Sequence, residues 1–490
     1  MHHAQSTTVA RTTMSRRGFV SAAAAGAAGV AMLGLGQVAR ADEVSFDEEH
    51  DIVIIGAGAA GLSAALILQE QGADFVLLES EDNVMPSALL SGGAISLCET
   101  DLASGTRDTF YENLLDASDH ECQEDLCRVY ADNAPEMYLK LVSWGVEFKG
   151  VSQVPHQTEP FCHSVGGGAN LIEPMFAALE KSGGQVLTGQ RATHLVMDDK
   201  RAVVGVIAET ADGEIAYAAK KGVILTCGDF TRNERFTKHF GTKHMPAMTP
   251  VSGQGCRGDG LIMGMYAGAD TSYLCAGIAP TAAVGLNTGK PSWLWGRNRS
   301  VPCIGMSGKR FHRESDNYVD VLSAALELGD VFFQLYDATA RENIGYAFEN
   351  DPEYSGATIE ELGAAVKADY PDFDVDSLMA EVERYNGFVD SGTDEDWGRT
   401  MTTTDGEALG KIETGPFYMM PFHIGTDHYA GGLRIDASDR VISVYGDVID
   451  GLYAAGGVAG GLSSWSYMTG SCIGRALVQG MVAARTAVEA

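Results

Sequence analysis

The segment from Asp51 to Glu79 most constrains how this chain can fold. A strand-like apolar run leads directly into the glycine-rich turn 56–61, and a helix pattern follows over 62–71. A second apolar run over 75–78 then ends at Glu79. Strand, glycine turn, helix, strand and terminal acid in this order are typical of a βαβ unit that binds a dinucleotide. The segment therefore predicts an α/β fold with a nucleotide site at its first turn.

Each glycine of the turn has its own expected role. Gly56 permits the tight bend, Gly58 lets the backbone approach a pyrophosphate, and Gly61 lets the helix lie close to the sheet. The start of the helix offers unpaired N–H groups and a partial positive charge to the phosphates. Glu79 is placed to hold a ribose diol. The unit alone does not distinguish NAD from FAD.

The first residues match an export signal. Residues 15–20, Ser-Arg-Arg-Gly-Phe-Val, fit the twin-arginine pattern, and an Ala/Gly-rich stretch continues to about residue 36. Ala39-Arg40-Ala41 is the expected cleavage site, so we expect 1–41 to be a twin-arginine signal peptide. The mature protein is then expected in the periplasm or at the outer face of the cell membrane. The apolar stretch is too short and too rich in Ala and Gly to predict a stable membrane anchor.

The chain is strongly acidic. Its 490 residues carry 66 acidic and 34 basic side chains, for a formal net charge of −32. This charge argues against binding to nucleic acid or to an anionic membrane. It suits plain solubility, and it also suits a basic electron-transfer partner. The nine cysteines form no CxxC or CxxCH motif, so we expect neither a haem nor a metal site.

Downstream of the first unit, helix and strand patterns alternate. A small-residue loop at 86–94 is followed by helical patterning over roughly 107–144 and by a helix near 171–182. Five strand-like runs follow, at 185–187, 192–197, 202–207, 214–217 and 222–228. We interpret the first four as a β-meander and the last as a buried strand.

The nucleotide-style pattern returns near the end of the chain. A less regular region spans about 274–428, and it is followed by a strand and glycine turn at 451–457 and a last helix from about Ser471. Two separated segments of the same type predict one discontinuous domain with an inserted cap.

Several motifs occur in the order found in the fumarate reductase flavoprotein superfamily. They are the unit at 51–79, the loop 87–93, the turn 258–260, the pattern 308–314 and the strand and turn 451–456. The chain resembles this superfamily over 48–490. The resemblance implies a Rossmann-like FAD-binding domain in two parts, 48–273 and 429–490, with an inserted α+β cap over 274–428. The loop 83–93 has no histidine of the kind that tethers flavin in some relatives, so we expect FAD to be bound non-covalently.

The resemblance also implies which residues contact FAD. Beside the three turn glycines, these contacts fall on Ala60, Glu79, Ser87, Ala88, Gly92, Gly93, Ala192, Asp259, Tyr429, Gly456, Gly457, Cys472 and Ile473. The last helix would aim its N-terminus at the N1–C2=O edge of the flavin and stabilise the reduced form. Gly457 departs from the glutamate that is usual in the superfamily.

The residues that grip two carboxylates in fumarate reductases are mostly replaced. Their arginines and one histidine correspond here to Tyr467, Asn317 and Ala279. His428 is retained, and Arg341 is placed to replace the proton-donor arginine. With most of the cationic clamp gone, we do not expect dicarboxylate reduction.

The replacements resemble the flavin-dependent 3-ketosteroid dehydrogenases, in particular the Δ4-(5α) type. Tyr318 follows the motif glutamate by four residues, and Tyr467 precedes Thr469 and Gly470 in the spacing of that branch. A phenol, with an unperturbed pKa near ~10, can donate a hydrogen bond to a developing enolate without charging an apolar site. Tyr467, supported by Thr469 and the Gly470 N–H, and Tyr318 are therefore the expected catalytic pair. The sequence leaves open which one polarises the carbonyl and which one exchanges the proton.

We therefore expect an FAD-dependent oxidoreductase that interconverts a C–C single bond and an α,β-unsaturated ketone, with an apolar, steroid-like substrate. One alternative is a reductase of enoates, such as fumarate or an aryl acrylate, that uses His428 and Arg341. Another is an electron-carrier flavoprotein without its own substrate. Because no second NAD-type fingerprint or haem motif is present, we expect a separate electron carrier, such as a cytochrome or a quinone-linked protein. Trp293 and Trp295 are expected to serve packing, and Asp229 has no explanation at this level.

Overall fold

The computed structural model describes most of the chain after the predicted export signal. The described ranges are 38–241, 248–274, 282–285, 291–292, 301–316, 318–329, 331–344, 352–402, 408–464 and 466–490. Several sequence-based predictions fall outside them, namely the body of the export signal, Ala279, Trp293, Trp295, Asn317 and the side chain of Tyr318. None of the described helices is both long and apolar enough to span a bilayer.

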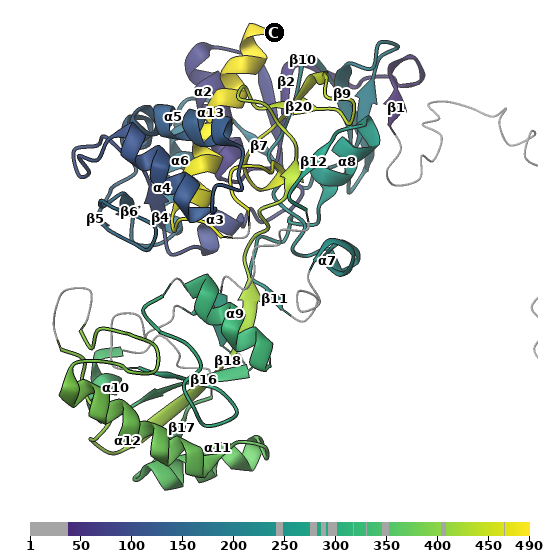
Figure 1. Ribbon diagram of the computed structural model, residues 1–490. Helices are drawn as coiled ribbons and strands as arrows, with labels where there is room; N and C mark the ends of the chain where they lie inside the picture. Colours follow the sequence, from purple (N-terminus) through teal and green to yellow (C-terminus); the bar gives the residue numbers. More distant parts are fainter. Residues whose placement is uncertain are drawn as a thin grey trace, which may run out of the picture. The chain divides into compact units, whose positions relative to one another are not determined.

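The predicted βαβ unit is confirmed, and it forms part of a nine-stranded sheet, near the edge that ends in β7 (Val186–Leu187) (Figure 1). Strand β2 (Glu48–Ile55) pairs in parallel with β3 (Phe75–Leu78), and α2 (Ala59–Gln71) connects them. Parallel pairing continues outward from β3 to β7 (Val186–Leu187) and from β2 to the second half of β10 (Gly213–Leu225), which pairs with β21 (Val448–Ala454). These strands end at the same edge, where α/β sheets bind their ligands.

The predicted β-meander is wrong in two respects. Only β8 (Arg191–Met197), β9 (Val203–Thr210) and the first half of β10 pair in antiparallel fashion, because β7 joins β3 instead. The runs 214–217 and 222–228 also form one strand rather than two. The register of β10 shifts between Ala219 and Gly222, and the strand passes from pairing with β9 to pairing with β21. A local irregularity of this kind lets one strand serve two neighbours.

The helical patterning over 107–144 resolves into two helices, α4 (Arg107–Ala117) and α5 (Glu124–Ser143). Asp119 and His120 both adopt positive φ values, of 51° and 57°, which end the first helix. A small antiparallel sheet of β4 (Ala94–Ser96), β6 (Cys162–Ser164) and β5 (Gly150–Ser152) lies in this part of the chain. The remaining elements of the nucleotide-binding part are β1 (Ala39–Arg40), η1 (Ala41–Glu43), α3 (Ser87–Leu90), α6 (Ala169–Lys181), α7 (Glu234–Phe240), α8 (Asp259–Ala267), β12 (Thr271–Ser272), β19 (Gly432–Leu433), β20 (Arg440–Ile442) and η4 (Gly456–Val458).

The last helix, α13 (Ser471–Glu489), packs directly on α2 (Figure 1). A Cβ atom at Gly480 would lie 2.1 Å from the carbonyl oxygen of Ala60, so only glycine allows this approach. The Ser63 hydroxyl also donates a 2.7 Å hydrogen bond to the Leu477 carbonyl. The contact fixes the start of α2 against the middle of α13.

Residues between Thr249 and Thr426 form a second sheet with its own hydrophobic core. Strand β18 (Phe417–Thr426) is central, and it pairs with β11 (Thr249–Pro250), β13 (Ala282–Gly285), β16 (Val331–Tyr336) and β17 (Tyr354–Gly356). The outer strands are β14 (Pro291–Ser292) and β15 (Cys303–Ile304), and the helices are α9 (Tyr318–Leu328), α10 (Ala338–Ile344), α11 (Ile359–Asp369) and α12 (Val375–Ser391). Phe333, Leu335 and Met419 bury their side chains against residues of α11 and α12 in this core.

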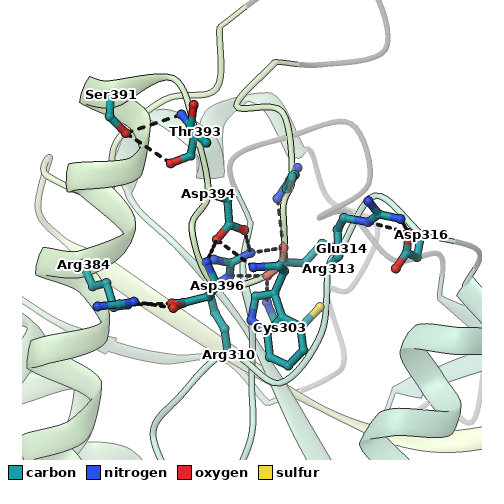
Figure 2. A network of polar contacts seen from close by, with 12 residues as sticks. Cys303, Arg310, Arg313, Glu314, Asp316, Arg384, Ser391, Thr393, Asp394 and Asp396 are labelled. Atoms are coloured by element: carbon teal, nitrogen blue, oxygen red, sulfur yellow. Dashed lines mark hydrogen bonds and ion pairs between the residues drawn. The ribbon is translucent and has the colours of Figure 1, made fainter.

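The motif at 308–314 forms a buried ion cluster in this second part (Figure 2). Arg310 donates two 2.7 Å hydrogen bonds to Glu314 and one of 2.8 Å to Asp394, and Arg399 donates to Glu314 at 3.1 Å. The side chains of Arg310, Glu314, Asp394 and Arg399 are all at most 1% exposed. Gly308 makes the turn possible, since a Cβ there would lie 2.1 Å from the Asp374 carbonyl oxygen. The motif glutamate is therefore a structural residue in this chain.

Candidate active site

A cavity opens at the strand ends, between the first turns of α2 and α13. Most of the residues that the sequence assigned to FAD line it. These are Gly56, Gly58, Ala60, Glu79, Ser87, Ala88, Gly92, Ala192, Asp259, Gly456, Gly457, Cys472 and Ile473. The predicted catalytic residues His428, Tyr467, Thr469 and Gly470 line the same cavity. Segments as far apart as 56 and 473 thus meet in one place.

Three of the predicted FAD contacts, Gly61, Gly93 and Tyr429, lie outside the described lining of the cavity. Gly61 and Gly93 allow close packing of the backbone. A Cβ atom at Gly61 would lie 1.9 Å from the Gly56 oxygen, and one at Gly93 would lie 2.6 Å from the Gly167 nitrogen. Tyr429 is fully buried and stacks on Phe230, with ring centroids 4.1 Å apart. These residues shape the walls behind the cavity surface.

The ribose end of the cavity is formed by fixed carboxylates. Glu79 accepts hydrogen bonds from the backbone N–H groups of Ala57 (2.9 Å) and Glu81 (3.0 Å). Asp259 is held by a bidentate pair with Arg191, with both hydrogen bonds at 2.9 Å. A carboxylate oriented in this way is a suitable acceptor for ribose hydroxyl groups.

The phosphate end is built from backbone. The first residue of α2 follows Gly58, which has no side chain to cap the helix, and a Cβ atom at Gly58 would meet only Pro86 at 3.8 Å. The first-turn N–H groups therefore face open space of the kind that a diphosphate needs. Ser87 contributes to the opposite wall, where its hydroxyl accepts a 2.9 Å hydrogen bond from the Gly253 N–H. These features fit a bound dinucleotide.

The end of the cavity where the resemblance places the flavin lies at the start of α13. Gly470 caps this helix with a φ of +85°, and a Cβ atom there would lie 2.8 Å from the Ser96 nitrogen. The Ser96 hydroxyl donates a 2.7 Å hydrogen bond to the Thr469 carbonyl. The helix N-terminus is therefore locked in position and points its partial positive charge into the cavity.

His428 connects three reactive groups in this part of the cavity. Its Nδ1 shares a 2.5 Å hydrogen bond with Asp427 Oδ1, and its Nε2 lies 3.0 Å from the Sγ atom of Cys472. Its ring also meets the ring of Tyr467 edge-on. Burial alone would lower the pKa of His428, but Cys472 and Asp427 together raise that pKa well above the usual imidazole value. No motif in the sequence marks Asp427 as the partner of this histidine.

Asp229, unexplained from the sequence, ties two walls of the cavity together. Its Oδ1 accepts hydrogen bonds from the N–H and hydroxyl of Thr231, both at 2.9 Å, and its Oδ2 accepts from the Tyr429 N–H at 3.0 Å. Burial raises the pKa of Asp229 above the usual aspartate value. The side chain thus fixes the segment that carries His428.

A family model described as "FAD binding domain" matches residues 51–473. The chain belongs to this family. It is 26% identical to vinyl phenol reductase of Lactiplantibacillus plantarum, over 90% of this chain and 97% of that protein. It is also 26% identical to 3-oxosteroid 1-dehydrogenase of Mycolicibacterium smegmatis, over 89% of this chain and 97% of that protein.

The fold is that of the flavoprotein part of fumarate reductases. The open conformation of a flavocytochrome c3 fumarate reductase is similar with a TM-score of 0.78 and 23% identity, covering 91% of this chain and 79% of that one. Family and fold together identify this member of the FAD-binding family as an FAD-dependent oxidoreductase of the fumarate reductase superfamily, and FAD as its cofactor.

One further residue of this FAD-binding chain went unnoticed in the sequence. Arg475 of α13 lines the cavity and is only 2% exposed, yet its Nη1 has no hydrogen-bond partner among the described residues. A buried guanidinium nitrogen without an acceptor is costly, and an anionic or carbonyl oxygen of a bound ligand would satisfy it. FAD supplies such groups in its diphosphate and in its reduced ring.

The described lining of the cavity leaves two predicted catalytic residues of this family member, Arg341 and Tyr318, untested or elsewhere. Arg341 lies outside the described lining, and it forms a 2.7 Å ion pair with Glu353, which also accepts a 2.6 Å hydrogen bond from Tyr336. Tyr318 is the first residue of α9, and its side chain falls outside the described atoms. No group of three or more metal-ligating side chains occurs in the described part of the chain.

Proposed function

We propose that this flavoenzyme interconverts a C–C single bond and the double bond of an α,β-unsaturated ketone, on an apolar and steroid-like substrate. The observation that carries the proposal is the pair of Tyr467 and His428, which meet edge-on beside the start of α13. Tyr467 occupies the position where a dicarboxylate enzyme needs a cation. Met85, Val251 and Ile473 add apolar surface to the same cavity.

Each residue of the cavity has its own role in the proposed reaction. Bound FAD supplies hydride exchange with the carbon β to the carbonyl. The Tyr467 hydroxyl donates a hydrogen bond to the carbonyl oxygen and stabilises the negative charge that develops there. Thr469 and the Gly470 N–H support the same oxygen. His428, with its ring oriented by Asp427, holds the proton that is exchanged at the α carbon.

Flavin reoxidation tests this proposal directly. The enzyme is reduced anaerobically and mixed with a 3-ketosteroid enone, a simple cyclic enone, fumarate and an aryl acrylate, while flavin absorbance is followed. We expect the enones to reoxidise the flavin. If fumarate or the aryl acrylate does so and no enone does, the ketone proposal is wrong.

A second candidate is a reductase of enoates. The observation in its favour is the raised pKa of His428, because an imidazolium in the cavity can bind a carboxylate. In that case Arg341→Ala should abolish activity, whereas the ketone proposal predicts a mild effect.

We also infer a separate electron carrier, such as a cytochrome or a quinone-linked protein. Failure of every compound in the panel would favour a flavoprotein that only carries electrons.

A further inference from the structure

Cys472 is the second residue of α13, and its side chain is partly exposed to the cavity. Its Sγ lies 3.0 Å from His428 Nε2, and the other ring nitrogen of His428 is bound to Asp427 at 2.5 Å. Carboxylate, imidazole and thiol therefore stand in one hydrogen-bonded row. This is the arrangement by which a histidine, oriented by an acid, activates a cysteine.

Two further features favour a reactive thiol at this position. The N-terminus of a helix stabilises a thiolate, and Cys472 lies in the first turn of α13. Burial, by contrast, raises the pKa of both Cys227 and Cys256, which line the same cavity, to about 12. Among the described residues, neither of these thiols forms a hydrogen bond with a histidine, and Cys256 is paired with the hydroxyl of Ser87 at 3.3 Å. The cavity thus holds one cysteine in contact with a histidine, and two other cysteines that serve as internal controls.

We propose that Cys472 is a nucleophile that adds to the β carbon of α,β-unsaturated carbonyl compounds in this cavity. The new S–C bond forms as the C=C π pair shifts to the α carbon. The thiol proton passes to His428 Nε2 and from there to the α carbon, so the product is a saturated thioether. Neither thiol nor flavin changes its oxidation state. The choice of compound rests on the proposed function, but the addition itself needs no hydride.

Mass spectrometry of the oxidised, FAD-loaded protein tests the addition. The probe is methyl vinyl ketone, with no electron donor present, and the modified peptides are quantified over time. Among the cysteines that line the cavity, we expect a fast adduct only on the peptide that contains Cys472. Cys472→Ala should remove it, whereas Cys227→Ala and Cys256→Ala should leave it in place. His428→Gln and Asp427→Asn should slow labelling of Cys472, by about a hundredfold for His428→Gln.

The outcomes separate this inference from the proposed function. Retained flavin absorbance shows that each variant has folded. Absence of an adduct on Cys472, or equal labelling rates in His428→Gln and the unsubstituted protein, would overturn the nucleophile. Reoxidation of the reduced enzyme by enones is measured independently and bears only on the proposed function. Labelling of Cys472 without reoxidation of the flavin by enones would therefore contradict the proposed function and leave the nucleophile in place.

Discussion

The imidazole of His428 stands edge-on to the phenol ring of Tyr467, with ring centroids 5.0 Å apart and ring planes at 85°. This contact joins two segments that are 39 residues apart in sequence and presents an imidazole and a phenol hydroxyl to one cavity. A carbonyl oxygen that enters the cavity can therefore meet a donor that carries no charge.

Removal of this hydroxyl should slow the reaction without displacing the cofactor. Tyr467→Phe keeps the ring contact with His428, so we expect FAD binding to persist and the rate of flavin reoxidation by an enone to fall about a hundredfold. Stopped-flow absorbance measures this rate. Tyr445→Phe is the control, since Tyr445 is 90% exposed. An unchanged rate for Tyr467→Phe would remove Tyr467 from the mechanism.

Arg475 should anchor the cofactor by charge. Arg475→Met removes a buried guanidinium whose Nη1 lacks a partner among the described residues, so we expect FAD affinity to fall by about ten- to a hundredfold. The same change should make the FAD-free protein more stable, because a buried donor group without a partner among the described residues is lost. Fluorescence titration with FAD and thermal melting of the FAD-free protein measure the two effects. Arg475→Lys, which keeps the charge, should retain more affinity than Arg475→Met, and equal affinities would contradict the charge argument.

The ion cluster in Figure 2 should control the stability of the second sheet. Glu314→Gln leaves Arg310 and Arg399 without their shared carboxylate, so we expect the free energy of unfolding to fall by about 3–5 kcal/mol. Urea unfolding measures this loss. Glu395→Gln changes an exposed glutamate in the same part of the chain and should have almost no effect. A loss below about 1 kcal/mol for Glu314→Gln would mean that the cluster contributes little.

Asp439 should make the free energy of unfolding decrease as the pH rises. Burial raises the pKa of Asp439 well above the usual aspartate value, and its Oδ2 has no hydrogen-bond partner among the described residues. The folded protein thus holds this proton more tightly than the unfolded chain does. The contribution is present below the unfolded pKa and is lost as the pH rises through the folded pKa.

Asp439→Asn removes that loss, and asparagine tolerates the φ of 57° at this position. We expect the variant to be more stable than the unsubstituted protein at neutral pH, by about 1–2 kcal/mol, and to lose this advantage in acid. Thermal melting across the pH range measures the difference. A constant difference at all pH values would contradict the assignment.

The export prediction has a simple test. Replacement of the pair by Arg16→Lys and Arg17→Lys should leave the protein in the cytoplasm, because the twin-arginine route depends on both residues. Cell fractionation measures this, and Arg11→Lys, which lies before the motif, is the matched control. Normal export of the double variant would refute the signal.

Local sequence order predicted the nucleotide-binding unit, and the resemblance to the fumarate reductase flavoprotein superfamily implied most of the residues that line the cavity. The turn 56–61 and Glu79 were identifiable because their roles depend on neighbours within one short segment. Asp427 and Arg475 could not be identified in this way, because their roles depend on side-chain geometry in the folded protein. Asp427 is recognised by its hydrogen bond to His428, and Arg475 by a buried nitrogen that lacks a partner among the described residues. The pairing of β7 and the continuity of β10 were mispredicted for the same reason, since the choice between neighbouring strands is made by the whole sheet.

The contact between Gly480 and Ala60 has a consequence for the chemistry of the whole cavity. The two helices that it joins are those expected to hold the diphosphate and the flavin of FAD, and they pack closely on each other. A change at this contact is therefore expected to disturb cofactor affinity and flavin position together. Variation in substrate is left to side chains such as Tyr467, which can be exchanged while the contact between the two helices stays as it is.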